Sequence, residues 1–334
     1  MVSSRRGFLA TAAMAAGAVS LELQARAAGK PAPSSGEILS LFKELQGEVG
    51  LKIHAPAADG RPEVLVSSNS DKQLFVGSAI KTFILCESLR QADSPQVVQT
   101  LKETTLALDA SVWSLDSATF NPPNLSGKVS QRTALEAMIM HSDNTGTDMC
   151  IKHAVPDKVR AFIASAGLKD TRIPDSTRAL FGYLGGVKDP RTITWDELQK
   201  AVSGPLVNLP LNSVETMASS ADDFVSYYSR ALQGAFFQHR ETLAEFRRIL
   251  SLGDAIWLVP MPLGVSAFSK GGSIDVPRFH AVCAPGAMLF DGRWVYFSFA
   301  YNWKAAGESD PASVGRFAAA VSEALARVKA GLSC

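Results

Sequence analysis

The sequence predicts an α/β (α+β) fold in which one antiparallel sheet is built from both ends of the chain. Two short extended runs lie near the N-terminus, at residues 50–55 and 63–67, and further extended runs lie within residues 266–301. Helical patterns flank the strands at each end, and the middle of the chain reads mainly as helix and loop. We therefore expect helices flanking the sheet and an all-α subdomain inserted between its two halves.

The first half of the sheet is predicted by local signals. Ser34 and Glu37 form a capping box before a helix whose apolar residues recur at helical spacing. Asp59-Gly60 predicts a hairpin turn between the first two strands. A short loop then leads through Phe75 to a helix that ends near Gln91. The chain thus enters the helical subdomain directly from the sheet.

The second half of the sheet is predicted as a meander with strands at 266–270, 279–290 and 294–301. Gly271-Gly272 and Asp291-Gly292 are the expected turns between these strands. A closing helix starts at Asp310-Pro311 and has one apolar face. We expect a single domain over 37–330, with a sheet lobe at about 37–77 and 235–330 and a helical lobe at about 78–234.

Composition excludes several classes of function. The 334 residues are 46% hydrophobic, as expected for a globular chain, and a net charge of +1 gives no basic field for nucleic acid or anionic lipid. The five histidines do not cluster, and there is no P-loop, G-x-G-x-x-G, H-E-x-x-H or G-x-S-x-G pattern. We expect a monomer that acts on a small molecule without a metal or a cofactor.

The first residues predict an export signal. Arg5-Arg6 precedes the weakly hydrophobic stretch 8–23, and Ala25-Arg26-Ala27 offers small residues for cleavage. This combination is typical of a twin-arginine signal peptide over residues 1–27, although a basic N-terminus before a surface helix fits the same residues. We expect a linker at 28–36, no membrane span in the mature chain, and a periplasmic or secreted location.

The four cysteines are far apart and include no C-x-x-C pair, which argues against a zinc site or a dense disulfide framework. Export would permit a disulfide. Three of them, Cys86, Cys150 and Cys283, lie in apolar segments, so we interpret these as small buried hydrophobic residues. Cys334 is the last residue of the chain, and its redox state stays open.

Ser78-Ala79-Ile80-Lys81 is the first pattern that could carry chemistry. Positions three apart share a face of a helix, so the Ser78 hydroxyl and the Lys81 amine can approach each other. The spacing alone is weak, because Ser40 and Lys43 repeat it on what we expect to be a surface helix. Ser78 and Lys81 therefore need support from other residues.

Two further patterns supply that support. In Ser142-Asp143-Asn144, a hydroxyl can pass a proton to a leaving amine while an amide holds the substrate, although the same residues are also favoured helix caps. In Lys270-Gly271-Gly272-Ser273, the glycines let a substrate lie against a strand and the Ser273 N–H can face an oxyanion. The alternative for this second pattern is an ordinary strand end with a glycine-rich turn.

The order of the three patterns along the chain resembles that of the penicillin-recognising serine hydrolases, and among them the class A β-lactamases. The resemblance extends from about residue 37 to 328 and implies a β-lactamase/transpeptidase-like fold. It implies that Ser78 attacks a carbonyl and forms an acyl-enzyme, that Lys81 takes its proton, and that Ser142 relays a proton to the departing nitrogen.

The resemblance also implies how the substrate is held. Backbone N–H groups of Ser78 and Ser273 would form the oxyanion hole. Asn144 would orient the substrate and Lys270 would attract its carboxylate, while Gly272 leaves room for it along the strand. A lysine can act as a base only as the neutral amine, which burial beside a second cation such as Lys270 favours for Lys81.

The sequence departs from the family where the acyl group must be released. Class A β-lactamases carry Glu-x-x-Leu-Asn on a loop, and an alignment started at Thr171 puts Thr177 and Phe181 at the positions of its glutamate and asparagine. Neither side chain can activate water. A second candidate base is Asp196 or Glu197, although Thr194 and Glu197 also form a capping box.

The third pattern departs as well, because Gly271 stands where threonine or serine is usual. Arg278 either compensates for the missing hydroxyl or is a solvated turn residue, which we favour. Three functions follow as alternatives. They are a β-lactamase, a DD-peptidase- or esterase-like acyl hydrolase that β-lactams acylate and that deacylates poorly, and a non-catalytic periplasmic ligand binder. The presence of Ser78, Lys81, Ser142 and Lys270 together argues against the ligand binder.

Overall fold

The computed structural model describes residues 34–58 and 62–333. The predicted signal peptide, most of the linker, the Asp59-Gly60 turn and Cys334 lie outside these residues. The first described helix, α2 (Ser35–Ser40), has the capping box of Ser34 and Glu37 that the sequence predicts, and it begins two residues before residue 37. Among the described helices, none has the length and apolar character that crossing a membrane requires.

The main sheet has seven strands, and every strand pair in it is antiparallel. They are β1 (Glu48–Ala55), β2 (Val64–Ser68), β7 (Ser266–Ser269), β8 (Gly272–Val276), β9 (Phe279–Cys283), β10 (Gly286–Phe290) and β11 (Arg293–Trp303). Their order is β2-β1-β11-β10-β7, with β9 also on β11 and β8 on β9. Because β1 lies beside β11, the two ends of the chain form one sheet, and the predicted fold class is confirmed.

The meander differs from the prediction in two places. The expected strand at 279–290 is broken at Ala284-Pro285 into β9 and β10, where proline has no N–H for the ladder. Gly271-Gly272 is not a hairpin turn, since β7 and β8 pair with β10 and β9 and so follow one edge of the sheet. The turn before β9 lies instead at Pro277-Arg278, where Arg278 has φ 71°.

Twelve α-helices and four short strands complete the part of the chain that is described. Besides α2, the helices are α3 (Lys81–Gln91), α4 (Val97–Glu103), α5 (Gln131–Met140), α6 (Asn144–Ala154), α7 (Pro156–Ser165), α8 (Thr177–Leu184), α9 (Trp195–Val202), α10 (Ala221–Ala231), α11 (Arg240–Leu250), α12 (Ala255–Leu258) and α13 (Pro311–Leu332). The short strands form two pairs, β3 (Leu74–Phe75) with β6 (Ala218–Ser219) and β4 (Thr105–Leu108) with β5 (Gly127–Ser130). Two 3₁₀ helices are η1 (Gly77–Ile80) and η2 (Pro190–Thr192).

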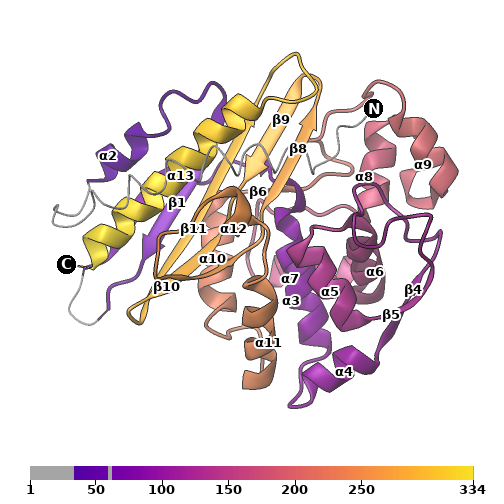
Figure 1. Ribbon diagram of the computed structural model, residues 1–334, viewed down its shortest axis with the longest axis horizontal. Helices are drawn as coiled ribbons and strands as arrows, with labels where there is room; N and C mark the ends of the chain where they lie inside the picture. Colours follow the sequence, from indigo (N-terminus) through magenta and orange to yellow (C-terminus); the bar gives the residue numbers. More distant parts are fainter. Residues whose placement is uncertain (1–33, 59–61, 334) are drawn as a thin grey trace.

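The sheet separates two apolar cores. On one face it meets α2 and α13 (Figure 1). Phe317 and Val321 of α13 belong to the same apolar cluster as Phe297 and Phe299 of β11. On the other face α10 contacts β1, β10 and β11, and its aromatic residue Tyr227 packs against Phe83 of α3. The helix α3 therefore lies inside the molecule, and Lys81 to Leu89 are all buried.

The packing of two helices differs from the predicted lobe boundary at residue 235. The helix α10 lies on the sheet although it precedes this boundary, and α11 contacts α3, α4 and α5 although it follows it. The reason is that α11 buries Phe246, Ile249 and Leu250 on one face, and these belong to the same core as the inserted helices. The side chains of Cys86, Cys150 and Cys283 are free and buried, as predicted.

Candidate active site

The Ser78 turn lies between the sheet and the helical lobe. Ser78 is in η1, which runs directly into α3 at Lys81. Ser78 is 4% exposed and Lys81 is fully buried. Gly77 has φ +53°, and an added Cβ would lie 2.8 Å from the Ser273 N of β8, so only glycine fits there without strain. The predicted nucleophile is thus held against the strand of the third pattern.

Gly272 determines how closely β8 approaches this turn. A Cβ at Gly272 would lie 2.0 Å from Val76 O and 2.7 Å from Ser78 N, closer than any side chain tolerates. With Gly77 and Gly272 both lacking a Cβ, the backbone N–H groups of Ser78 and Ser273 lie in the same small region. Two such donors in one place are the arrangement that stabilises an oxyanion.

The second pattern is both a helix cap and part of the site. Asp143 is the N-cap of α6 and accepts a hydrogen bond from Gly146 N at 2.8 Å, so the cap interpretation is right. Ser142, just before it, has φ 53°, and its carbonyl and hydroxyl oxygens lie 2.7 and 3.2 Å from Lys81 Nζ. Capping by Asp143 therefore leaves its two neighbours available to Lys81.

Asn144 completes the surroundings of Lys81. Its Oδ1 accepts a hydrogen bond from Lys81 Nζ at 2.7 Å, and its Nδ2 donates to Leu115 O at 2.9 Å. The second bond fixes which way the amide faces, because only the nitrogen can donate to a carbonyl. Lys81 of the first pattern thus contacts two residues of the second pattern, Ser142 and Asn144.

The third pattern reaches the same hydroxyl. Lys270 is fully buried, and its Nζ lies 3.1 Å from Ser142 Oγ. The Ser142 hydroxyl therefore lies between two lysine amines that are 189 positions apart in the chain, at 3.2 Å from Lys81 and 3.1 Å from Lys270. Such a hydroxyl is placed to exchange protons with either amine.

Lys270 also has a carboxylate partner that sequence reasoning missed. Both oxygens of Asp254 lie 2.8 Å from Lys270 Nζ, and Oδ1 also accepts a hydrogen bond from Gly271 N at 3.0 Å. Asp254 follows Gly253 at the start of α12, sixteen residues before Lys270, and no local pattern connects the two. Only the packing of α12 on β7 brings them together.

Thr177, which the family resemblance aligns with the deacylating glutamate, lies against Asn144. It begins α8, is 1% exposed, and its Oγ1 lies 3.3 Å from Asn144 O. The same hydroxyl contacts Asp148 Oδ1 at 2.8 Å and Ser114 Oγ at 2.7 Å. Where a glutamate would point at the acyl group, this chain has a short hydroxyl that is already surrounded by partners.

Asp148 is a second buried carboxyl that the sequence reasoning missed. It accepts hydrogen bonds from the backbone N–H groups of Thr177 at 2.6 Å and Arg178 at 3.1 Å. Burial raises its pKa to about 6, although these donors work in the opposite direction. Its position four residues after Asn144 on α6 is a signal that could have indicated it, since positions four apart share a helix face.

The alternative base candidates lie elsewhere. Glu197 is exposed and accepts hydrogen bonds from Thr194 N and Oγ1 at 2.9 and 2.8 Å, which lower its pKa. It thus forms the capping box of α9, and Asp196 beside it is also exposed. Arg278 is exposed in the turn between β8 and β9, as expected for a solvated residue. In the second Ser-x-x-Lys pair, Ser40 at the end of α2 and Lys43 in the following turn are both exposed.

Comparison with known families agrees with this geometry. The model of the beta-lactamase enzyme family matches residues 34–251, which is more than half of the chain. The chain belongs to this family. The comparison with curated protein sequences gives no match.

Solved structures with the same fold are similar to this family member over most of their length. A class A beta-lactamase from Bacteroides cellulosilyticus is 17% identical with a TM-score of 0.67, over 90% of this chain and 99% of that one. A class A beta-lactamase from Mycobacterium abscessus is 15% identical with a TM-score of 0.62, over 86% and 97%. The protein PBP-A is 15% identical with a TM-score of 0.61, over 87% and 94%. Family and fold together support a β-lactamase-like acyl hydrolase of the serine type that binds a small molecule.

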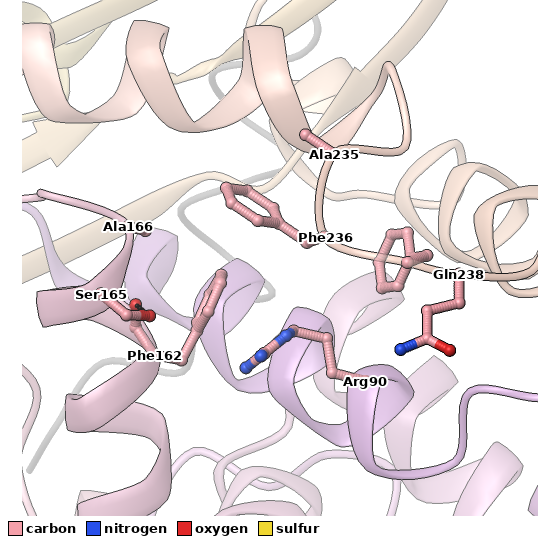
Figure 2. Close-up of a pocket in the computed structure, with 8 residues that line it drawn as sticks. Arg90, Phe162, Ser165, Ala166, Ala235, Phe236 and Gln238 are labelled. Atoms are coloured by element: carbon pink, nitrogen blue, oxygen red, sulfur yellow. Dashed lines mark hydrogen bonds between the residues drawn. The ribbon is translucent and has the colours of Figure 1, made fainter.

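This β-lactamase-family protein also has a surface cavity at the far end of α3 (Figure 2). The cavity of about 300 Å³ is lined by Arg90, Phe162, Phe236 and their neighbours. The Arg90 guanidinium lies over the Phe162 ring, 4.9 Å from its centroid. Arg90 is nine residues after Lys81, or about 13 Å along the helix, so this cavity is separate from the residues described above. Within residues 34–58 and 62–333, no cluster of three or more histidine, cysteine or acidic residues is placed to hold a metal.

Proposed function

We propose that this protein hydrolyses β-lactam amides through an acyl-enzyme formed on Ser78. The observation that supports this most is the position of the Ser142 hydroxyl, at 3.2 Å from Lys81 Nζ and 3.1 Å from Lys270 Nζ. A proton removed from Ser78 by Lys81 can pass through this hydroxyl to the nitrogen that leaves. Family membership over residues 34–251 supports the same chemistry.

In the proposed reaction, Ser78 Oγ forms a bond to the lactam carbonyl carbon while its proton moves to the neutral amine of Lys81. The negative charge on the carbonyl oxygen is stabilised by the N–H groups of Ser78 and Ser273. The C–N bond then breaks as Ser142 donates its proton to the nitrogen and recovers one from Lys81. Water finally cleaves the ester and restores Ser78.

One observation favours a second function in which this last step is slow. Thr177 stands where the family's glutamate is expected, and its hydroxyl contacts Asp148, Ser114 and Asn144. A hydroxyl is a poor base at neutral pH, and the carboxyl of Asp148 is held by three donors of α8. We therefore propose as the alternative a DD-peptidase- or esterase-like enzyme that β-lactams acylate and that releases the acyl group slowly.

One experiment tests both proposals. Purified mature protein is mixed with benzylpenicillin, and its intact mass is followed over time. Both proposals expect a mass increase of one penicillin on the wild type and none on Ser78→Ala. Ser40→Ala is the matched control, because it removes the serine of the exposed Ser-x-x-Lys pair and should behave as wild type.

The time course then separates the two functions. Loss of the adduct within seconds together with penicilloic acid formation indicates a β-lactamase, whereas an adduct that persists for hours indicates the slow enzyme. If the wild type is labelled neither by benzylpenicillin nor by a fluorophosphonate probe and also forms no penicilloic acid, both proposals are wrong and a non-catalytic ligand binder is favoured.

We also propose that the chain is exported by the twin-arginine route. The support is the Arg5-Arg6 pair before the weakly hydrophobic stretch 8–23. Replacing both arginines by lysine should leave the precursor in the cytoplasm of a host bacterium, as measured by fractionation and immunoblotting. Export of the double-lysine chain at the wild-type rate would contradict the twin-arginine proposal.

A further inference from the structure

Asp254 occupies a position that bears on which substrates this site accepts. Its two carboxylate oxygens both lie 2.8 Å from Lys270 Nζ, and Oδ1 also accepts the Gly271 N–H at 3.0 Å. Lys270 is fully buried, whereas the side chain of Asp254 is 26% exposed. The carboxylate therefore covers the cation of the third pattern from the solvent side.

Two glycines fix this arrangement. A Cβ on Gly253 would lie 1.7 Å from Ser269 O, so the backbone just before Asp254 lies directly on the end of β7. A Cβ on Gly271 would lie 3.1 Å from Ala255 Cβ and 3.3 Å from Asp254 Oδ1, which is tighter than ordinary contact. The glycine that replaces the usual serine or threonine in the third pattern is thus the residue that leaves room for Asp254.

The charges at this point disfavour a second carboxylate. Lys270 Nζ already has both Asp254 oxygens, Ser142 Oγ and Gly271 O within hydrogen-bond distance. A substrate carboxylate that approached Lys270 would have to displace Asp254 or lie beside it as a like charge. A neutral group at the same place would meet no such repulsion.

We propose that Asp254 is a specificity-determining residue that selects substrates without a free carboxylate on the leaving-group side of the scissile bond. The preferred substrates are then neutral lactams, amides or esters, with Asp254 providing the negative charge that a carboxylated substrate would otherwise bring to Lys270. This inference rests on the proposed acylation of Ser78, and it adds the substrate class.

The test compares the same penicillin with and without the negative charge of its carboxylate. The rate constant for acylation of Ser78 is measured by intact mass for benzylpenicillin and for its methyl ester, on wild type and on Asp254→Asn. Asparagine keeps an oxygen for Gly271 N but has no charge. The wild type should react faster with the ester, and Asp254→Asn should shift the ester-to-acid ratio toward the acid by roughly 10- to 100-fold, the effect of one hydrogen bond to a charged group.

Two controls keep the result specific. Asp222→Asn removes the charge of another Lys–Asp pair, Lys52–Asp222 at 2.7 Å between β1 and α10, and should leave the ratio unchanged. If Asp254→Asn lowers thermal stability, Asp254→Ser is expected to give the same shift in the ratio, because it also removes the charge.

The outcomes distinguish this inference from the proposal it rests on. Acylation by both probes, with a ratio that Asp254→Asn and Asp254→Ser leave unchanged, overturns the role of Asp254 and leaves the proposed function intact. A wild type that prefers the acid over the ester also overturns it. If both probes give neither an adduct nor a hydrolysis product, the proposed function itself is overturned, and the inference with it.

Discussion

Asp143 is the residue whose removal should cost the site most in stability. Its carboxylate is fully buried and accepts hydrogen bonds from Gly146 N and Thr119 N, both at 2.8 Å, and from Phe120 N at 3.1 Å. Asp143→Ala removes an N-cap, which costs about 1 kcal/mol, and leaves two further N–H groups without this acceptor, at about 1–3 kcal/mol each when buried. Because Thr119 is itself exposed, water replaces part of its bond. We expect a loss of about 3–5 kcal/mol in the free energy of unfolding.

The assay is urea unfolding followed by circular dichroism, with Ser130→Ala as the matched control. Ser130 caps α5 by accepting a hydrogen bond from Thr133 N at 3.1 Å, and its hydroxyl also contacts Thr133 Oγ1 at 2.9 Å. Loss of this cap should cost only about 1 kcal/mol. The difference between the two variants measures the buried acceptors beyond the cap. A loss for Asp143→Ala no larger than that for Ser130→Ala would refute the reasoning, since it would mean that Thr119 and Phe120 do not depend on Asp143.

Three further predictions follow from the geometry of the site. Burial raises the pKa of Asp148 to about 6, so the folded protein binds this proton more tightly than the unfolded chain does. The resulting stability is present at low pH and is lost as the pH rises through about 6. In unfolding curves at a series of pH values, the free energy of unfolding of the wild type should fall by about 3 kcal/mol relative to that of Asp148→Asn. Parallel pH profiles for the two proteins would contradict this. Lys81→Met should slow acylation by benzylpenicillin about 100- to 10,000-fold, measured by intact mass, and an unchanged rate would exclude Lys81 as the base. Glu197→Ala should lower thermal stability by loss of its capping box and leave the release of the acyl group unchanged, and slower release would return Glu197 as the deacylating base.

Local interactions are the part of this protein that its sequence determines most directly. The capping boxes at Ser34 and Thr194, the antiparallel pairing of β1 with β2, and the proline-containing start of α13 all form where the pattern predicts them. The capping boxes and the start of α13 depend on residues within a few positions of one another, and the β1–β2 pairing joins strands that are consecutive in the sequence, so local patterns are enough to specify them. The pairing of the chain ends in one sheet was also predictable, because both ends read as strands with a flanking helix.

The sequence does not by itself determine the structural role of the Gly271-Gly272 pair. Gly271-Gly272 has the composition of a turn, but in the structure it follows the sheet edge and lets β8 approach the Ser78 turn. A glycine pair indicates either a turn or a close approach of two backbones, and only the position of η1 distinguishes them. The sequence also does not predict that the backbone of Gly253 lies close to Ser269.

The candidate active site depends both on sequence order and on tertiary packing. Sequence order alone indicates Ser78, Lys81, Ser142, Asn144 and Lys270 as a set. In the tertiary structure, Lys81 lies within hydrogen-bond distance of Ser142 and Asn144, and Lys270 lies within hydrogen-bond distance of Ser142. Only the tertiary structure decided which further side chains these residues contact. Asp254 reaches Lys270 because α12 packs on β7, and Asp148 holds Thr177 because α6 and α8 are packed together. Those contacts depend on where distant helices pack, and no pattern within a few residues of sequence encodes them.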